Sequence, residues 1–400
     1  MTMELLTRIQ RELNLLEQQG LRRILRVADT PCAPRVQVDG KPMLAFCSND
    51  YLGLAADARI VQALREGAGI YGAGSGASHL ISGHSRAHAL LEERLAHMLE
   101  PFVPSAKALY FSTGYMANLA LMTALTCMDP QAEIFSEALN HASLIDGMRL
   151  ARAAVKVYAH GDVAALEQLL GASKSATKVV VTDSVFSMDG DLAPLRQLLA
   201  LCEKHGAWLV VDDAHGFGVL GRRGHGVLEH LDLRSDHLVY LGTLGKAAGV
   251  SGAFVAAHAD VVDWMVQKAR SYIYTTASSP ALAHALLTSL DIIVGEEGAQ
   301  RRVRVGELIQ AMRAGLSGGN WNLLMSDTCI QPIVVGGNEA ALDMAAALFR
   351  KGLWVPAIRP PTVPRGTARL RVTLSAAHTV DDVRQLLEAL NAIQAEEDHA

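Results

Sequence analysis

The stretch from residue 208 to residue 246 carries an acid, an imidazole and an amine at the ends of two apolar runs. The run 208–212 ends in Asp-Asp-Ala-His-Gly, which contributes Asp212 and His215. A second short run, 238–241, leads to Thr243 and Lys246. Apolar runs of this length that end in polar residues are typical of buried strands. In a parallel sheet both polar sets would emerge at the carboxyl edge, where open α/β folds bind ligands.

An acid, a histidine and a lysine at one sheet edge suit the binding of a pyridine aldehyde. Lys246 would form an imine with the aldehyde, Asp212 would lie against the ring nitrogen, and His215 would lie near the ring hydroxyl. A lysine Schiff base with an acidic partner for the pyridinium nitrogen is the signature of pyridoxal phosphate (PLP) enzymes. The same residue types fit a strand-end carboxylate and a solvated lysine equally well, so the rest of the chain has to decide.

A phosphate site is predicted after the apolar run 106–111. Ser112-Thr113-Gly114-Tyr115 follows this run and opens a helix. Unpaired amides at a helix start form a cradle for phosphate, and Gly114 permits close approach of the backbone. Thr243, three residues before the lysine, could bond a phosphate oxygen. Many strand-to-helix turns contain glycine, so this motif is weak by itself.

Other side chains could complete a site. His141 follows the run 134–135 and could stack on a pyridine face, although an ordinary loop histidine is as good an interpretation. Ser187 lies in a polar segment after the run 179–182 and offers a hydroxyl. Arg359 and Arg371 flank a loop with three prolines, and a guanidinium is the usual fork for a substrate carboxylate. An arginine on a strand more often lies on a solvated face.

The elements around these residues alternate between short apolar runs and helical periods. This pattern predicts a mostly parallel sheet with helices on both faces. The expected strands are 106–111, 134–135, 155–158, 179–182, 208–212, 238–241 and 253–256. The expected helices between them are 115–126, 142–152, 162–170 and 194–205. The glycine-rich segment 72–85 is expected to be an ordered loop without regular structure.

Three parts of the chain are expected to form separate regions. Residues 1–46 read as an amphipathic helical arm followed by a hairpin, and residues 47–285 as the large α/β domain. Residues 286–400 read as a smaller α+β domain with helices 338–351 and 380–396 and strands 330–335, 354–357 and 369–374.

Composition restricts the class of protein. Half of the 400 residues are hydrophobic and the formal charge is only −5, with both signs interspersed, which argues against a nucleic acid partner. Five scattered cysteines without C-x-x-C spacing argue for reduced thiols and against disulfides or a zinc site. The amino terminus lacks the apolar core of a signal peptide, and the most apolar window, 119–127, is too short for a bilayer. We therefore expect a soluble cytoplasmic protein without a metal ion.

The chain resembles the PLP-dependent α-oxoamine synthases, enzymes of the aspartate aminotransferase fold (fold type I), over nearly its whole length. The resemblance is carried by seven motifs: 48–53 (Ser-Asn-Asp-Tyr-Leu-Gly), 74–76, 82–83, 112–114, 186–191, 212–216 and 243–246, together with His141. The segments 358–364 and 366–371, with 21–23, are similar to the branch of the family that acts in biotin biosynthesis. One departure is Thr-Leu-Gly-Lys-Ala-Ala-Gly at 243–249, where aromatic residues are commoner.

The resemblance implies a reaction and its residues. L-alanine would condense with a pimeloyl thioester of coenzyme A (CoA) or acyl carrier protein, with loss of carbon dioxide and of the carrier thiol. Lys246, Asp212 and His141 would be catalytic. The PLP contacts would come from Gly114, Tyr115, His141, Ser187, Asp212, His215, Thr243 and Lys246. Arg371 would grip the alanine carboxylate, and Arg22, Asn49 and Thr362 would contact the acyl substrate. In this family two subunits share the active site, so Thr275 and Thr276 would reach the partner's phosphate in a homodimer.

Two other functions remain compatible with these residues. The first is another enzyme of the same family, such as glycine C-acetyltransferase. The second is a regulatory or scaffold protein that binds the cofactor without turnover. The intact set of Lys246, Asp212, His215 and Arg371 argues against the second, because binding alone would not require the lysine. The distal carboxylate of a pimeloyl group needs a cation, and Arg22 or Arg359 is the expected one.

Overall fold

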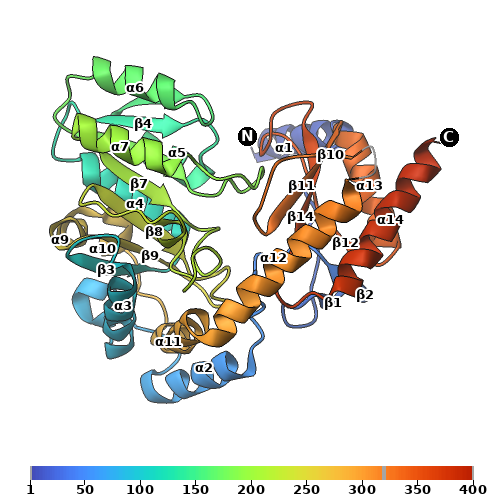
Figure 1. Ribbon diagram of the computed structural model, residues 1–400, viewed down its shortest axis with the longest axis horizontal. Coiled ribbons are helices and arrows are strands. Elements are labelled where there is room, and N and C mark those ends of the chain that lie inside the picture. The colour runs from blue at the N-terminus through green and yellow to red at the C-terminus, as the bar shows by residue number, and fades with distance from the viewer. Residues whose placement is uncertain (1, 318–320, 399–400) are drawn as a thin grey trace. The chain divides into compact units, whose positions relative to one another are not determined.

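The computed structural model describes residues 2–317 and 321–398, which fold into two compact units (Figure 1). The first unit comprises Met1–Tyr51, Met188–Asp191 and Arg304–Ala400, and the second comprises Leu52–Ser187 and Leu192–Val303. The boundaries predicted after residues 46 and 285 stay predictions. In the part of the chain that the structure describes, no helix is both long enough and apolar enough to span a lipid bilayer.

A seven-stranded sheet forms the centre of the second unit, in the order β3-β9-β8-β7-β6-β4-β5. Its strands are β3 (Ala106–Phe111), β4 (Glu133–Glu137), β5 (Ala154–Tyr158), β6 (Lys178–Asp183), β7 (Trp208–Asp212), β8 (Leu238–Thr243) and β9 (Ala253–His258). The strands β5, β4, β6, β7 and β8 pair in parallel, and β9 is antiparallel to both of its neighbours. All seven strands expected from the sequence are present, and the mostly parallel α/β fold is confirmed.

The sheet is buried on both faces, which explains why its strands read as continuous apolar runs. On one face Val210 of β7 and Val239 of β8 pack against α4 (Gly114–Thr126) and α5 (Ala142–Ala151). The neighbouring residues Val211 and Tyr240, which point to the other face, are also fully buried. The second unit further contains α2 (Ala58–Tyr71), α3 (Arg86–Leu99), α6 (Val163–Ala172), α7 (Leu195–His205), α8 (Val227–His230), α9 (Ala259–Lys268), α10 (Arg270–Ile273) and α11 (Pro280–Val294).

Local capping residues begin several of these helices where the sequence suggests. Asp162 accepts a hydrogen bond from the Ala165 amide at 2.9 Å and caps α6. Thr113 caps α4 through the Met116 amide at 3.2 Å. The glycine-rich segment 72–85 differs from the expectation, because His79–Gly83 forms a short π-helical turn. The turn is stabilised by contacts of histidine side chains, which are described below and which the amino-acid composition of the segment does not indicate.

Within its described residues, the first unit contains two small sheets and three helices of its own. One sheet has the order β10-β11-β14-β13 and the other β1-β2-β12. The strands are β1 (Arg35–Val38), β2 (Lys41–Ala45), β10 (Asn322–Leu323), β11 (Ile330–Gly336), β12 (Leu353–Trp354), β13 (Ala357–Ile358) and β14 (Ala368–Thr373). The helices are α1 (Thr2–Gln18), α13 (Asn338–Arg350) and α14 (Val380–Asp398), and α12 (Glu296–Leu316) contributes residues to both units.

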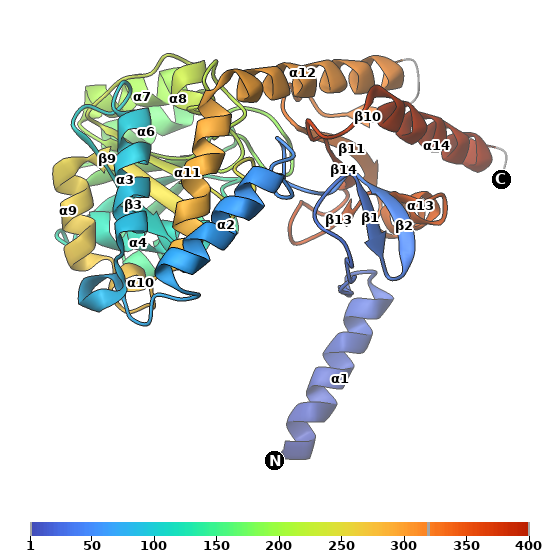
Figure 2. The same ribbon diagram turned by 90° about the horizontal axis from the view of Figure 1, so that it is seen from below.

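The expected strand 354–357 is wrong as a single element. Its two ends belong to β12, which pairs with β2, and to β13, which pairs with β14. Pro356 lies between them and has no amide hydrogen for a ladder, so one continuous strand is interrupted there. The amphipathic arm is confirmed: α1 projects from the rest of its unit in Figure 2, with Leu5, Leu6 and Ile9 exposed.

Candidate active site

The strand ends of the seven-stranded sheet bring the predicted residues of the second unit to one edge. Phe111 at the end of β3 is paired with Ala253, which in turn is paired with Thr243 at the end of β8. Asp212 at the end of β7 lies between Asp183 and Leu241 of the neighbouring strands. The segments after β3, β6, β7 and β8 therefore leave the sheet at the same edge, as the sequence analysis predicted.

Asp212 is a buried carboxylate that is held by two donors. It is 5% exposed, and its Oδ2 accepts a hydrogen bond from Asn118 Nδ2 at 2.7 Å. Its Oδ1 accepts from the backbone amide of Ala214 at 3.0 Å. Asn118 was missed by the sequence analysis, although it lies one helical turn after Gly114 on α4 and so on the same face of that helix. A buried charge needs such donors to hold one orientation.

His141 caps α5 and is joined to Asp212 by a chain of hydrogen bonds. Asn118 Nδ2 also donates to Ser143 Oγ at 2.9 Å, and Ser143 Oγ lies 2.7 Å from His141 Nδ1. The Ser143 amide donates to the same Nδ1 at 3.2 Å, so this nitrogen is an acceptor and Nε2 carries the proton of the neutral ring. Desolvation lowers the pKa of His141, and Lys246 adds to this effect while Asp212 opposes it.

A second buried carboxylate, Asp183, lies beside Asp212 in the sheet. Its Oδ2 accepts a hydrogen bond from the His141 amide at 2.7 Å. Burial raises the pKa of Asp183 well above its usual value, and the neighbouring charge of Asp212 raises it further. Two adjacent carboxyl groups in a dry environment disfavour double ionisation. The buried position beside Asp212 therefore favours the protonated form of Asp183.

The side chains of Lys246 and His215 are neighbours at the same edge of the sheet. Lys246 Nζ lies 3.2 Å from His215 Nε2. Thr243 Oγ1 donates to the Ala214 carbonyl at 3.1 Å and so ties the loop after β8 to the loop after β7. The aliphatic residues of the lysine segment do not leave it open to water, since Leu244 and Ala248 are fully buried. The lysine is therefore presented by a packed turn.

The remaining predicted residues of the second unit lie at the start of α4, in the segment after β6, and between α10 and α11. Tyr115 follows Gly114, and its hydroxyl donates to the Asp146 carboxylate. Ser187 is partly buried at the end of the segment that follows β6. Thr275 is partly buried and Thr276 is exposed, in the segment between α10 and α11. The Ser278 hydroxyl donates to Ser112 Oγ at 2.8 Å. This hydrogen bond links the segment between α10 and α11 to the predicted phosphate site after β3.

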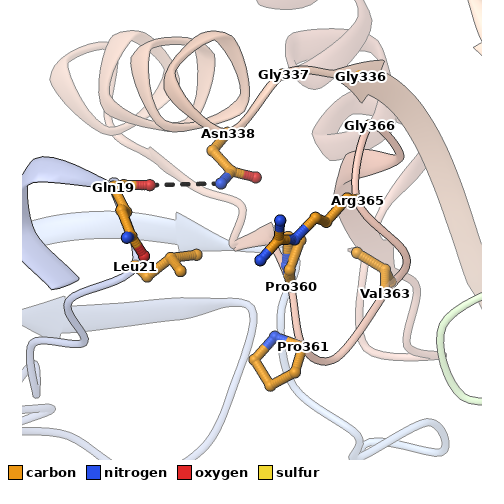
Figure 3. Close-up of a pocket in the computed structure, with 10 residues that line it drawn as sticks. All are labelled: Gln19, Leu21, Gly336, Gly337, Asn338, Pro360, Pro361, Val363, Arg365 and Gly366. Atoms are coloured by element: carbon orange, nitrogen blue, oxygen red, sulfur yellow. Dashed lines mark hydrogen bonds between the residues drawn. The ribbon is translucent and has the colours of Figure 1, made fainter. Parts of the chain in front are cut away.

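The predicted substrate residues belong to the first unit. Arg371 lies on β14, is 6% exposed, and donates to Asn49 Oδ1 at 3.3 Å and to Thr373 Oγ1 at 3.2 Å. It is therefore not on a solvated face, and two of the predicted substrate residues are neighbours. Arg22 is exposed and forms an ion pair with Glu17 at 3.0 Å. Thr362 is exposed in the proline loop, which borders a groove of about 770 Å³ within this unit (Figure 3).

A group of three histidines in the second unit was not anticipated. His79 Nδ1 lies 3.0 Å from His84 Nδ1, and the His79 ring stacks on Tyr272 with centroids 4.8 Å apart. His88 Nδ1 accepts from the Ser85 amide at 3.1 Å, and His88 Nε2 lies 3.0 Å from the Ser278 carbonyl. Both ring nitrogens of His88 are thus used within the protein. Through these contacts the three histidines connect the glycine-rich segment 72–85 and the start of α3 to Tyr272 and Ser278.

The residues of the sheet edge fit PLP. A phosphate cradle is available at the start of α4, where a Cβ on Gly114 would lie 3.0 Å from Thr243 Cγ2 and narrow the space. The fixed carboxylate of Asp212 suits a protonated pyridine nitrogen, and the amine of Lys246 suits an aldehyde. Asn118 Oδ1 is buried without a hydrogen-bond partner in the described part of the chain. Because buried polar atoms are normally hydrogen-bonded, this oxygen leaves an acceptor for a polar group of a bound molecule.

Comparisons with known proteins show the family of this chain. The family model for aminotransferase class I and II matches residues 41–390. An 8-amino-7-oxononanoate synthase from Janthinobacterium sp. (strain Marseille) is 65% identical over 394 residues, which cover 98% of this chain and 100% of that protein. The enzyme of the same name from Bordetella petrii is 64% identical over 398 residues, with 100% of both chains covered.

Solved structures support the same conclusion. A serine palmitoyltransferase from S. paucimobilis with bound PLP-myriocin aldimine has a TM-score of 0.89 at 28% identity and covers 96% of both chains. An 8-amino-7-oxononanoate synthase from Francisella tularensis has a TM-score of 0.75 at 28% identity, covering 90% of this chain and 99% of that one. The chain is a fold type I, PLP-dependent enzyme that belongs to the class I and II aminotransferase family and, within it, to the 8-amino-7-oxononanoate synthases.

Proposed function

We propose that this chain catalyses the decarboxylative condensation of L-alanine with a pimeloyl thioester, the 8-amino-7-oxononanoate synthase reaction of biotin biosynthesis. The observation that carries the proposal is the identity of 60 to 65% with enzymes of that name over at least 94% of the chain. The acyl carrier in this proposal is CoA or acyl carrier protein. A cytoplasmic location belongs to the proposal, and the five free cysteines support it.

The acid and the base of the reaction would come from Asp212 and Lys246. When bound, PLP supplies an electron sink for negative charge at the α-carbon of alanine. Asp212 would keep a proton on the pyridine nitrogen, and its two fixed donors support this because the carboxylate needs no reorganisation. Lys246 would remove the α-proton of alanine, and its amine, partly buried at the sheet edge and 3.2 Å from His215 Nε2, supports this role.

His141 would act as a neutral hydrogen-bond donor. Its Nδ1 is occupied by Ser143, so the proton on Nε2 can be donated to the thioester carbonyl or lie against the ring. The lowered pKa of His141 supports the neutral form during turnover. A donor of this kind stabilises the charge that develops when the carbanion attacks the thioester.

The phosphate and ring hydroxyl of the cofactor would be held by loops of the second unit. Gly114 and Tyr115 would offer backbone amides and Thr243 a hydroxyl to the phosphate, while Ser187 and His215 would face the ring hydroxyl. The cradle at the start of α4 and the hydrogen bond of Thr243 to the loop after β7 support this assignment. Thr275 and Thr276 would complete the phosphate site of the partner subunit in a homodimer.

The substrates would be bound by the first unit. Arg371 would form the fork for the alanine carboxylate, and its burial beside Asn49 supports a fixed guanidinium plane. Asn49, Arg22 and Thr362 would contact the acyl substrate.

One assay matrix tests the proposed function. Purified protein with PLP is given alanine, glycine or serine with pimeloyl-CoA, acetyl-CoA or palmitoyl-CoA, and thiol release is followed together with the mass of the amino ketone. We expect the pair of alanine and pimeloyl-CoA to exceed all the others in kcat/KM. A parallel arm with pimeloyl-acyl carrier protein compares the two carriers. A higher kcat/KM for glycine with acetyl-CoA would refute the proposal in favour of glycine C-acetyltransferase.

A further inference from the structure

Three histidines where the π-helical turn meets α3 present ring nitrogens to one another. One nitrogen from each of His79, His84 and His88 lies within 4.8 Å of the other two. His79 Nδ1 and His84 Nδ1 are 3.0 Å apart. We call these three residues the histidine cluster. Imidazole nitrogen is a frequent ligand of divalent transition metal ions, and three protein ligands are enough for a metal site.

Hydrogen bonds fix the tautomer of His88. Its Nε2 lies 3.0 Å from the Ser278 carbonyl, which can only accept, so Nε2 carries the proton. Its Nδ1 accepts from the Ser85 amide at 3.1 Å. Histidines that bind metal ions commonly donate one ring N–H to a carbonyl or carboxylate and use the lone pair of the other nitrogen as the ligand. An ion would take this lone pair from the Ser85 amide, and because Ser85 is only partly buried, water can then accept from the amide.

Glu92 offers the corresponding outer partner to His84. Its Oε2 lies 3.7 Å from His84 Nε2, and its side chain is only 16% exposed. Its other oxygen, Oε1, accepts from the Tyr110 amide at 2.9 Å, which holds the carboxylate in place. With its proton on Nε2, His84 would donate to Glu92 after a small rotation of the ring and would keep the lone pair of Nδ1 for an ion. A carboxylate behind a histidine ligand orients the ring and raises its basicity.

The third ring, His79, is positioned by packing. It is 7% exposed and stacks on Tyr272, with ring centroids 4.8 Å apart and an interplanar angle of 11°. His84 is exposed, so an ion can reach the cluster from solvent. Metal–nitrogen bonds of about 2.0 to 2.1 Å place neighbouring ligands of a tetrahedral ion about 3.3 Å apart. The distance of 3.0 Å between His79 Nδ1 and His84 Nδ1 is close to this value.

A hydrogen bond from one Nδ1 to the other accounts for the contact of His79 with His84 in the absence of an ion. It does not account for the third imidazole beside them or for the carboxylate at the far nitrogen of His84. When an ion binds, the ring that donates this hydrogen bond takes the other tautomer, with its proton on Nε2, so no net proton is lost.

We propose that the histidine cluster is a binding site for one divalent transition metal ion, such as Zn²⁺, with His79, His84 and His88 as its protein ligands. Glu92 is a positioning residue that acts through His84, and water would complete a four-coordinate ion. The expectation of a protein without a metal ion rested on the cysteines and did not consider histidine ligands. Because the cluster connects the segment 72–85 and α3 to the chain around Ser278, the ion would stabilise these segments.

Calorimetric titration of the untagged holoenzyme with Zn²⁺ tests the ligands. The variants are H84Q, H79F, which keeps a ring that can stack on Tyr272, and E92Q. The control is H97Q, which changes an exposed histidine on α3. We expect the wild type and H97Q to bind one ion with equal affinity. E92Q should lose about tenfold in affinity, the usual scale for an outer partner of a ligand, and H84Q and H79F at least about a hundredfold.

Thermal unfolding separates binding from folding. In the presence of a chelator, the unfolding midpoint of each variant shows whether it is folded without an ion. With excess Zn²⁺ the midpoint should rise for the wild type and H97Q but not for H84Q or H79F, because an ion that binds only the folded chain stabilises it. Neither measurement uses alanine or a thioester, so the result does not depend on the proposed function.

X-ray absorption spectroscopy of the one-to-one Zn²⁺ complex identifies the ligands directly. We expect imidazole nitrogens at about 2.0 Å and no sulfur at about 2.3 Å. Sulfur ligands would place the ion on the cysteines and overturn the inference, and so would unchanged affinity in both H84Q and H79F. If the wild type shows no saturable binding of Zn²⁺, the cluster is a hydrogen-bonded structural element only.

Discussion

Two successive carboxylates, Asp212 and Asp213, have different environments at the end of one strand. Asp212 is held by Asn118 and the Ala214 amide at the sheet edge. Asp213 instead accepts from Tyr240 at 2.6 Å and from the Val227 amide at 2.8 Å, and burial raises its pKa to about 7. Successive side chains on a strand point to opposite sides. One acid is therefore placed for chemistry and its neighbour for holding the loop around α8.

Lys246→Ala is expected to abolish covalent attachment of PLP and to reduce turnover by at least about a thousandfold, because nucleophile and base are lost together. The measurement is borohydride reduction of the holoenzyme followed by peptide mass spectrometry, with the yellow absorbance followed in parallel. His215→Gln is the matched control, because it removes the neighbour of the amine but leaves the amine itself. A reduced adduct on a different lysine in the variant would show that Lys246 is not the attachment point.

Asp212→Asn is expected to leave PLP bound and to slow exchange of the alanine α-proton by about a hundredfold or more, since a neutral amide stabilises the pyridinium charge less well. Deuterium incorporation into alanine measures this step without the thioester. Asp213→Asn serves as the control. We expect it to lower the thermal stability, while the rate of alanine α-proton exchange, expressed per folded protein molecule, stays near that of the wild type. Equal exchange in Asp212→Asn and wild type would contradict the role of Asp212.

At the scale of elements, the turn from β3 into α4 depends on close approach of backbones. Gly114→Ala adds a Cβ that would meet Thr243 Cγ2 at 3.0 Å. We expect the affinity for PLP to fall by about tenfold, while the stability of the cofactor-free protein is unchanged or slightly higher, because alanine favours a helix over glycine by about 1 kcal/mol. Fluorescence titration and thermal unfolding measure the two effects.

Gly171→Ala is the matched control for this change. It lies in α6, and the nearest side-chain atom to its added Cβ is His205 Cε1 at 4.0 Å. It should leave the affinity for PLP unchanged. If Gly114→Ala and Gly171→Ala bind PLP equally well, the start of α4 does not form the phosphate cradle.

The histidine cluster between the π-helical turn and α3 predicts loss of stability in acid. Burial lowers the pKa of His79 to about 3 and that of His88 to about 4. In the unfolded chain a histidine titrates near ~6.5. Above that pH the ring is neutral in both states. As the pH falls from about 6.5 towards 4, the unfolded chain takes up protons that the folded chain excludes, so the free energy of unfolding decreases.

His79→Phe keeps a ring that can stack on Tyr272 but removes one titrating group of this cluster. We expect a shallower decrease in the free energy of unfolding between pH 6.5 and pH 4 than in the wild type, measured by urea denaturation at several pH values in the presence of a metal chelator. His97→Gln, on an exposed face of α3, is the control. An identical pH slope for His79→Phe and the wild type would exclude His79 as a source of this dependence.

At the scale of the whole molecule, the proposed homodimer with shared sites predicts complementation. Lys246→Ala removes the lysine, and Thr276→Glu places a negative charge where the partner's phosphate is expected. Each variant alone should be nearly inactive. Co-expressed with different tags, they should recover roughly a quarter of the wild-type sites, because half of random dimers are mixed and each mixed dimer has one intact site.

The recovered activity should co-purify with the mixed dimer after two successive affinity steps. Sedimentation of each single variant checks that both still form dimers. Absence of activity in mixed dimers of normal size would contradict the contribution of Thr276 to the partner's site.

The sequence by itself determined the elements and the edge at which the chemistry takes place. Apolar runs with polar ends located β7 and β8, and their order along the chain predicted a parallel sheet, so Asp212, Thr243 and Lys246 could be placed together. These inferences succeeded because periodicity and turn residues are local properties that a single chain displays. The same local pattern missed the break at Pro356 and the turn at 79–83.

Only the tertiary structure decided which polar groups have partners. It joined Asn118 and Ser143 from two helices into one chain between Asp212 and His141. It also brought ring nitrogens of His79, His84 and His88 within 4.8 Å of one another. The cost of burying a charge depends on donors and acceptors that lie far away in the sequence, so pairing becomes visible only when the chain is folded.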